Sequence, residues 1–95
     1  MSDRNAYEQK LRAKLDEMQA EVDKLKARAK GAEADKRIEH EKEVDELEAK
    51  RDEMRQKLDA LRDASDDAWD DIKAGAESAW SSLSESIEKA RSRFK

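Results

Sequence analysis

Apolar residues follow a heptad spacing through the first third of the chain. From Leu11 to Ala32 they are separated alternately by four and three residues, which places them in one stripe along a helix. Arg28 and Lys30 fall in the last turn of this segment and Gly31 follows them, a combination typical of a helix end. The pattern predicts a helix over about residues 4–30, with a coiled-coil seam formed by Leu11, Leu15, Met18, Val22, Leu25 and Ala29.

The seam loses its phase after Ala32. The spacing would place the next apolar residue at Lys36, but the series resumes at Ile38 in a register shifted by one position. This break beside Gly31 predicts a turn at about residues 31–34, with Asp35 as the cap of the next helix. An unbroken helix with one skipped residue is the alternative, because a glycine inside a helix costs only about 1 kcal/mol.

The second half of the chain carries two apolar series with a spacing of eleven residues. Eleven residues make almost three full helical turns, so each series runs nearly straight along one helix face. The two series are Leu47, Leu58, Trp69 and Trp80, and Leu61, Ile72, Leu83 and Phe94. They predict one long helix over about residues 35–93. In its first half the seam consists of Val44, Leu47, Met54, Leu58 and Leu61.

A second break is conceivable at residues 63–67, where Ser65 can cap a third helix. Such a break would give three arms of nearly equal length and a three-helix bundle. Against it, the eleven-residue series pass through this segment in phase, and narrow seams suit two-stranded packing better than bundles, whose helices need wider apolar faces. We therefore expect an all-α coiled coil, a long helical hairpin with its turn near Gly31 and an extended amphipathic second helix.

Residues 64–94 differ in composition from the rest of this predicted helix. Lys73 is the only Lys or Arg between Asp63 and Glu88, serine becomes frequent, and the apolar face becomes bulkier. This face can pack against a partner helix or a second copy of the chain, or it can lie in a lipid surface. We favour packing, and hence a homo-oligomer, over a membrane surface. The candidate binding residues are Trp69, Ile72, Ala76, Trp80, Leu83, Ile87 and Phe94.

Composition narrows the class of protein. Charged residues make up 48% of the 95 residues and proline is absent, which is typical of coiled coils and long solvated helices. This length holds a single domain over residues 1–95. The net charge of −4, with acids and bases interspersed, leaves no basic face for nucleic acid. Without a secretory signal or a long apolar run, we expect a cytoplasmic protein, with peripheral membrane binding as the alternative.

Catalytic and cofactor chemistry finds little support in the sequence. The chain has no cysteine, and its one histidine, His40, lies among glutamates without the spacing of a zinc site. A surface or seam histidine is the better interpretation. A thin coiled coil also lacks the cleft that shifts the pKa values of a catalytic carboxylate pair apart. We therefore expect no enzyme activity, no metal, no cofactor and no small-molecule substrate.

Three stretches carry a resemblance: residues 6–17 (AYEQKLRAKLDE), 21–27 (EVDKLKA) and 64–80 (ASDDAWDDIKAGAESAW), the last being the most specific. They resemble a family of small coiled-coil proteins of cyanobacteria and proteobacteria that are described as stress-response proteins. Met18 stands where the family has Trp, which keeps the seam hydrophobic. The resemblance implies an α-helical cytoplasmic protein linked to stress, without a catalytic residue or a cofactor.

These observations predict a non-enzymatic, stress-associated interaction protein that self-associates or binds a partner helix through the stripe containing Trp69 and Trp80. The alternative is a peripheral membrane protein that uses the amphipathic segment 64–94. Both hypotheses can hold for one protein, if an oligomer buries the stripe until the protein meets a lipid surface.

Overall fold

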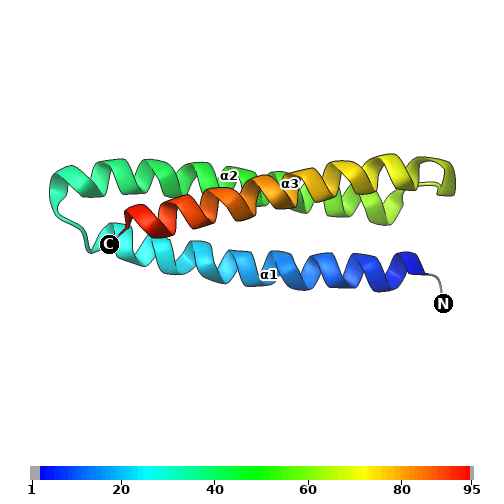
Figure 1. Ribbon diagram of the computed structural model, residues 1–95, viewed down its shortest axis with the longest axis horizontal. Coiled ribbons are helices and arrows are strands. Elements are labelled where there is room, and N and C mark those ends of the chain that lie inside the picture. The colour runs from blue at the N-terminus through cyan, green and yellow to red at the C-terminus, as the bar shows by residue number, and fades with distance from the viewer. Residues whose placement is uncertain (1–2, 95) are drawn as a thin grey trace.

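Three helices of nearly equal length make up the protein in the computed structural model, which describes residues 3–94. Helix α1 spans Asp3–Lys30, α2 spans Ala34–Asp63 and α3 spans Asp66–Arg93. Successive helices run antiparallel and lie side by side, which gives an elongated bundle of 50 × 19 × 17 Å (Figure 1). A helix rises 1.5 Å per residue, so each of these helices is about 42–45 Å long and runs nearly the full length of the bundle.

The predicted helical hairpin is wrong, and so is the continuous second helix over residues 35–93. The chain reverses at Ala64 and Ser65, whose backbones are extended (φ −69°, ψ 143° and φ −68°, ψ 163°). The hydroxyl of Ser65 accepts a hydrogen bond of 3.4 Å from the amide of Ala68, and two aspartates occupy the first turn of α3. Both features favour the start of a new helix. The protein is all-α, but it is a three-helix bundle rather than a two-helix coiled coil.

The turn between α1 and α2 lies at residues 31–33, where the heptad seam loses its phase. The amide of Gly31 donates to the carbonyls of Ala27 and Arg28, each at 3.2 Å, so α1 closes with an ordinary final turn. Glu33 occupies the N-cap position of α2 with an extended backbone, but its side chain makes no capping hydrogen bond. No residue in the described range 3–94 has a positive φ, so this reversal does not use a left-handed glycine.

The seam residues predicted for the first two helices supply most of the core. Met18 is partly buried, and the remaining seam positions are buried: Leu11, Leu15, Val22, Leu25, Ala29, Val44, Leu47, Met54, Leu58 and Leu61. Helix α3 adds Ala76, Leu83, Ile87 and Ala90, and Phe94 follows its end. Among the described residues no polar or charged residue is buried. The core is therefore held by apolar packing, in which each fully buried large side chain contributes about 1.5–3 kcal/mol.

Helices α1 and α3 approach each other less closely than either approaches α2. Large side chains fill this wider seam. They are Tyr7 and Met18 from α1, with Trp69 and Trp80 from α3, and all four pack partly buried against the core. The bundle thus consists of two tight helix pairs that share α2, and a third interface that depends on aromatic and long side chains.

Candidate functional site

The candidate binding residues lie along the face of α3 that points into the bundle. We term them the α3 stripe, which comprises Trp69, Ile72, Ala76, Trp80, Leu83, Ile87 and Phe94. Four of these residues are buried, while Ile72 and the two tryptophans are partly buried against the core. The structure places all seven in one row, but helices α1 and α2 of the same chain already cover this row. The stripe is therefore not a free surface in the closed bundle.

An aromatic and cationic cluster fastens the first part of the stripe to α1. The ring of Tyr7 meets that of Trp69 edge-on, with centroids 5.7 Å apart and planes at 72°. The Nζ atom of Lys73 lies 4.6 Å from the Tyr7 ring centroid and 5.5 Å from that of Trp69. The guanidinium of Arg4 lies 5.5 Å from the same Trp69 ring. Such edge-on pairs and cation–ring contacts each stabilise a structure by about 0.5–1 kcal/mol or slightly more.

The phenol of Tyr7 titrates at higher pH than an ordinary tyrosine. Burial raises the pKa of Tyr7, and the carboxylate of Glu77 raises it further through its charge and through hydrogen bonding. The neutral phenol therefore persists in the seam between α1 and α3 at any physiological pH.

Arg4 connects the start of α1 to the reversal between α2 and α3. Its Nη1 donates to Oδ1 of Asp66 at 2.7 Å, and its Nη2 donates to the carbonyls of Ala64 at 2.8 Å and Leu61 at 3.4 Å. These carbonyls lie at the end of α2, where the last carbonyls of a helix generally lack partners within the helix; that of Leu61 also accepts from the amide of Ala64 at 3.4 Å. One guanidinium therefore caps α2 and pairs with the first turn of α3. Sequence reasoning missed Arg4, because its partners are far away along the chain.

The two tryptophans of the stripe carry polar atoms that the closed bundle leaves unpaired. The Nζ atom of Lys14 lies 4.2 Å from the ring centroid of Trp80 and covers it from α1. The indole Nε1 atoms of Trp69 and Trp80 are buried, and neither has a hydrogen-bond partner among residues 3–94. An unpaired buried donor costs about 1–3 kcal/mol, and buried tryptophans normally find an acceptor. The stripe is thus well packed in its apolar part and unsatisfied at these two atoms.

An open groove of about 450 Å³ separates α1 and α3 beyond Trp80. Its lining residues are Glu17, Met18, Ala20, Glu21, Ser84, Ile87, Glu88 and Arg91. Arg91 crosses the groove, with Nη2 2.8 Å from Oε2 of Glu21 on α1 and Nη1 3.0 Å from Oε1 of Glu88. The hydrogen bond from Arg91 lowers the pKa of Glu21. The groove therefore combines a small apolar surface with a charged edge.

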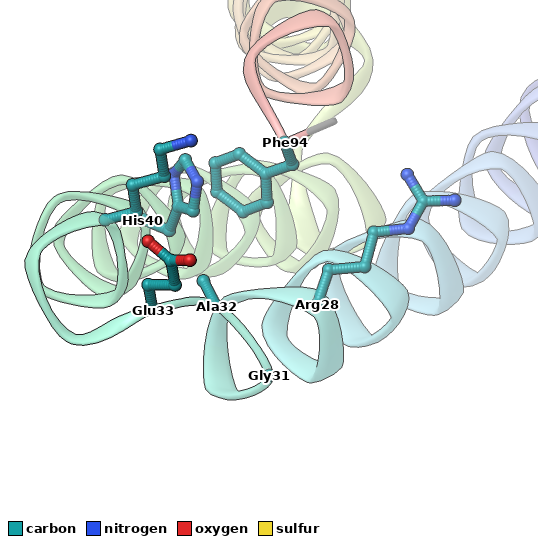
Figure 2. Close-up of a pocket in the computed structure, with 7 residues that line it drawn as sticks. Arg28, Gly31, Ala32, Glu33, His40 and Phe94 are labelled. Carbon is teal, nitrogen blue, oxygen red and sulfur yellow. The ribbon is translucent and has the colours of Figure 1, made fainter.

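Phe94 closes the stripe at the opposite end of the bundle by stacking on His40 of α2. The ring centroids are 4.1 Å apart and the planes are inclined by 36°. Figure 2 shows this stack beside the turn between α1 and α2, next to an open pocket of about 420 Å³ that Arg28 and Glu33 also line. His40 packs at the end of the bundle. Within residues 3–94, no group of three or more His, Cys, Asp or Glu side chains is arranged to hold a metal ion.

Comparisons with known proteins give no functional information, so the functional inference rests on the geometry of the α3 stripe. No protein-family model, no curated protein sequence and no solved structure matches the chain. None of the helices in the described part of the chain is both long enough and apolar enough to span a membrane.

Proposed function

We propose that this protein is a non-enzymatic interaction protein whose α3 stripe binds a lipid–water interface after α1 moves away. The observation that carries the proposal is the pair of buried, unpaired indole N–H groups of Trp69 and Trp80. At a lipid–water interface the indole ring enters the apolar region while its N–H reaches water or lipid oxygen atoms. Such an interface therefore satisfies both parts of the side chain, which the closed bundle does not.

Charge on α3 indicates which lipid surface would suit the stripe. The first turns of α3 carry Asp66, Asp67, Asp70 and Asp71, and Lys73 is the only base before the last turns of the helix. Anionic lipid would repel this segment. A neutral, loosely packed bilayer would accept large apolar side chains above a weakly charged polar face. The proposed surface is therefore a neutral membrane with packing defects.

Displacement of α1 is the step that would uncover the stripe. In the seam between α1 and α3, the ion pairs of Arg4 with Asp66 and of Arg91 with Glu21 lie partly exposed. Exposed pairs of this kind contribute only about 0–1 kcal/mol each. Insertion into lipid would bury again the stripe side chains that lose their cover, and each aromatic or aliphatic side chain so buried contributes about 1.5–3 kcal/mol.

Vesicles with brominated acyl chains test this proposal, because bromine quenches tryptophan fluorescence only on contact with the bilayer interior. We expect small neutral phosphatidylcholine vesicles to quench the whole protein. Ile72→Glu places a charge in the stripe and should weaken the quenching. Ile38→Glu is the matched control, because Ile38 lies on α2 outside the stripe and is 71% exposed. The proposal fails if the unmodified protein is not quenched, or if the two variants bind equally well while both remain helical by circular dichroism.

A partner helix is the second candidate for the binding surface, and the open groove at Met18 and Ile87 favours it. A helix from another copy or from a client protein could cover these apolar side chains and meet the charged edge. Ala20→Glu should block the groove and reduce any lipid-independent association seen by light scattering. Ala60→Glu, at an exposed position of α2, is the control. The resemblance to stress-response proteins suggests stressed cells as the setting for either form of binding.

A further inference from the structure

The turn between α1 and α2 lacks the local features that usually fix a helical turn. Gly31 does not adopt a positive φ. The N-cap residue Glu33 is extended (φ −60°, ψ 153°) but makes no side-chain capping bond. The other turn differs, because Ser65 caps α3 and the guanidinium of Arg4 binds the end of α2. The first turn is therefore held in place by the packing of the helices that it joins.

The residues around this turn are also suited to a helix. The segment 28–36 (RAKGAEADK) contains no proline and no β-branched residue, and its poor helix formers are Gly31 and, to a smaller extent, Asp35. A Cβ atom at Gly31 would approach no other atom more closely than 3.7 Å, so the turn does not require glycine for reasons of space. Local preference thus differs little between a turn and a continuous helix.

We propose that residues 31–33 are a hinge, and that α1 and α2 join into one helix in a domain-swapped dimer of this chain. The joined helix would span residues 3–63, about 90 Å at 1.5 Å per residue. Because the joined helix is straight, α1 no longer packs against α2 and α3 of the same chain. The face of α2 and α3 that becomes exposed is then covered by α1 of the second copy, through the same contacts as in the monomer. Only the hinge changes conformation, which makes swapping an accessible route to a dimer.

The groups that lose their contacts when α1 leaves indicate that the partner is α1 of a second copy. Without α1, the vacated face presents the rings of Trp69 and Trp80, whose cover in the monomer comes from Tyr7 and Lys14. It also presents the partners of Arg4 at the start of α3. Another α1 is complementary to all of these groups at once. Because two chains combine, the share of swapped dimer rises with protein concentration.

Two substitutions at the hinge should move this equilibrium in opposite directions. Gly31→Ala favours the joined helix by about fivefold per hinge, and thus raises the dimerisation constant roughly 25-fold. Ala34→Pro should keep the turn, because proline suits the first position of a helix and Glu33 already has the extended backbone required before proline. Inside a joined helix the same proline would clash with the preceding turn and remove a hydrogen bond. The dimer should therefore disappear.

Light scattering coupled to size-exclusion chromatography measures the dimer share after incubation of the concentrated protein. Gly75→Ala is the control for helix propensity. It lies inside α3, and its new Cβ would meet only the Lys57 side chain, at 3.9 Å. It should leave the dimer share unchanged, and circular dichroism should show that Ala34→Pro keeps its three helices. The proposal is overturned if Gly31→Ala forms no more dimer than Gly75→Ala, or if a dimer persists in helical Ala34→Pro.

Discussion

Replacing Arg4 with glutamine would remove the contact that ties the start of α1 to the reversal between α2 and α3. The guanidinium makes a charge-assisted bond of 2.8 Å to the carbonyl of Ala64, and a longer one of 3.4 Å to Leu61. It also pairs with Asp66 at 2.7 Å and lies over the ring of Trp69. Glutamine retains part of the aliphatic stem but cannot reproduce this set of contacts.

The magnitude follows from these contacts. The short bond to a carbonyl contributes about 1–1.5 kcal/mol after allowing for solvation of the freed oxygen, and the longer bond adds little. The pair with Asp66 contributes less than about 0.5 kcal/mol, because that carboxylate is 94% exposed. The ring contact adds about 0.5 kcal/mol. We expect Arg4→Gln to lower the free energy of unfolding by about 2 kcal/mol, and hence Tm by roughly 8–16 °C for a domain of this size.

Urea unfolding, followed by both far-ultraviolet circular dichroism and tryptophan fluorescence, measures this loss. Arg4→Lys should fall between the parent and Arg4→Gln, because an ammonium keeps the charge but cannot reach carbonyl and carboxylate together. Arg55→Gln is the matched control. Within the described residues 3–94, the guanidinium of Arg55 pairs only with Gln19 and Asp52 at the surface, and its loss should change the free energy of unfolding by less than about 0.5 kcal/mol. The reasoning is refuted if Arg4→Gln is no more destabilising than Arg55→Gln.

Three further predictions concern the core, a helix cap and a titrating group. In urea unfolding, Leu83→Ala should lower the free energy of unfolding by about 2–5 kcal/mol, because Leu83 is fully buried. Ile38→Ala at the surface should lower it by less than about 0.5 kcal/mol. Similar losses for the two variants would contradict the packing of α3. Ser65→Ala should cost about 0.5–1 kcal/mol, since its capping bond is long at 3.4 Å, and an unchanged stability would show that the cap is not formed. Because burial and Glu77 raise the pKa of Tyr7, ultraviolet titration should give a midpoint above about 10, and Glu77→Gln should lower it. The raised pKa contributes stability below the pKa of an unfolded tyrosine, and this contribution is lost as the pH rises through the pKa of Tyr7 in the folded protein. A titration midpoint equal to that of an unperturbed tyrosine would contradict the contact between Tyr7 and Glu77.

The burial of individual positions could be predicted from the sequence, because it follows from the periodicity of each helix by itself. The buried positions from Leu11 to Leu61 are the heptad positions. The end of α2 could not be predicted in this way. A turn can join two helices at any rotation about their axes, so the uninterrupted spacing from Leu58 to Trp69 carried no information about continuity. The capping residue Ser65 marked the break correctly, and the phase argument wrongly outweighed it.

The width of the apolar faces was also misjudged, for a physical reason. Narrow seams pointed to two-stranded packing, but long charged side chains can bury their aliphatic stems and widen a face. Arg51 fills a seam position of α2 with a side chain only 14% exposed, and the Arg4 side chain is 26% exposed.

The residues of the α3 stripe could be identified from the sequence, whereas the side chains that pack over them could not. Tyr7, Lys14 and Arg4 reach the stripe from α1, and only the fold brings α1 and α3 together. Single-sequence patterns report which face of a helix is apolar. They do not report which side chains of another helix lie upon it.

An odd number of antiparallel helices has a mechanical consequence. Helix α1 begins at one end of the bundle and α3 ends at the other (Figure 1). Tension along the long axis would therefore pull α1 and α3 in opposite directions, parallel to the seam that joins them. All contacts of that seam share such a load at once, as in shear, instead of peeling apart one after another. If both ends of the chain were attached to other structures, the bundle, about 50 Å long, would resist extension until α1 slides along α3. This sliding would expose Trp69 and Trp80.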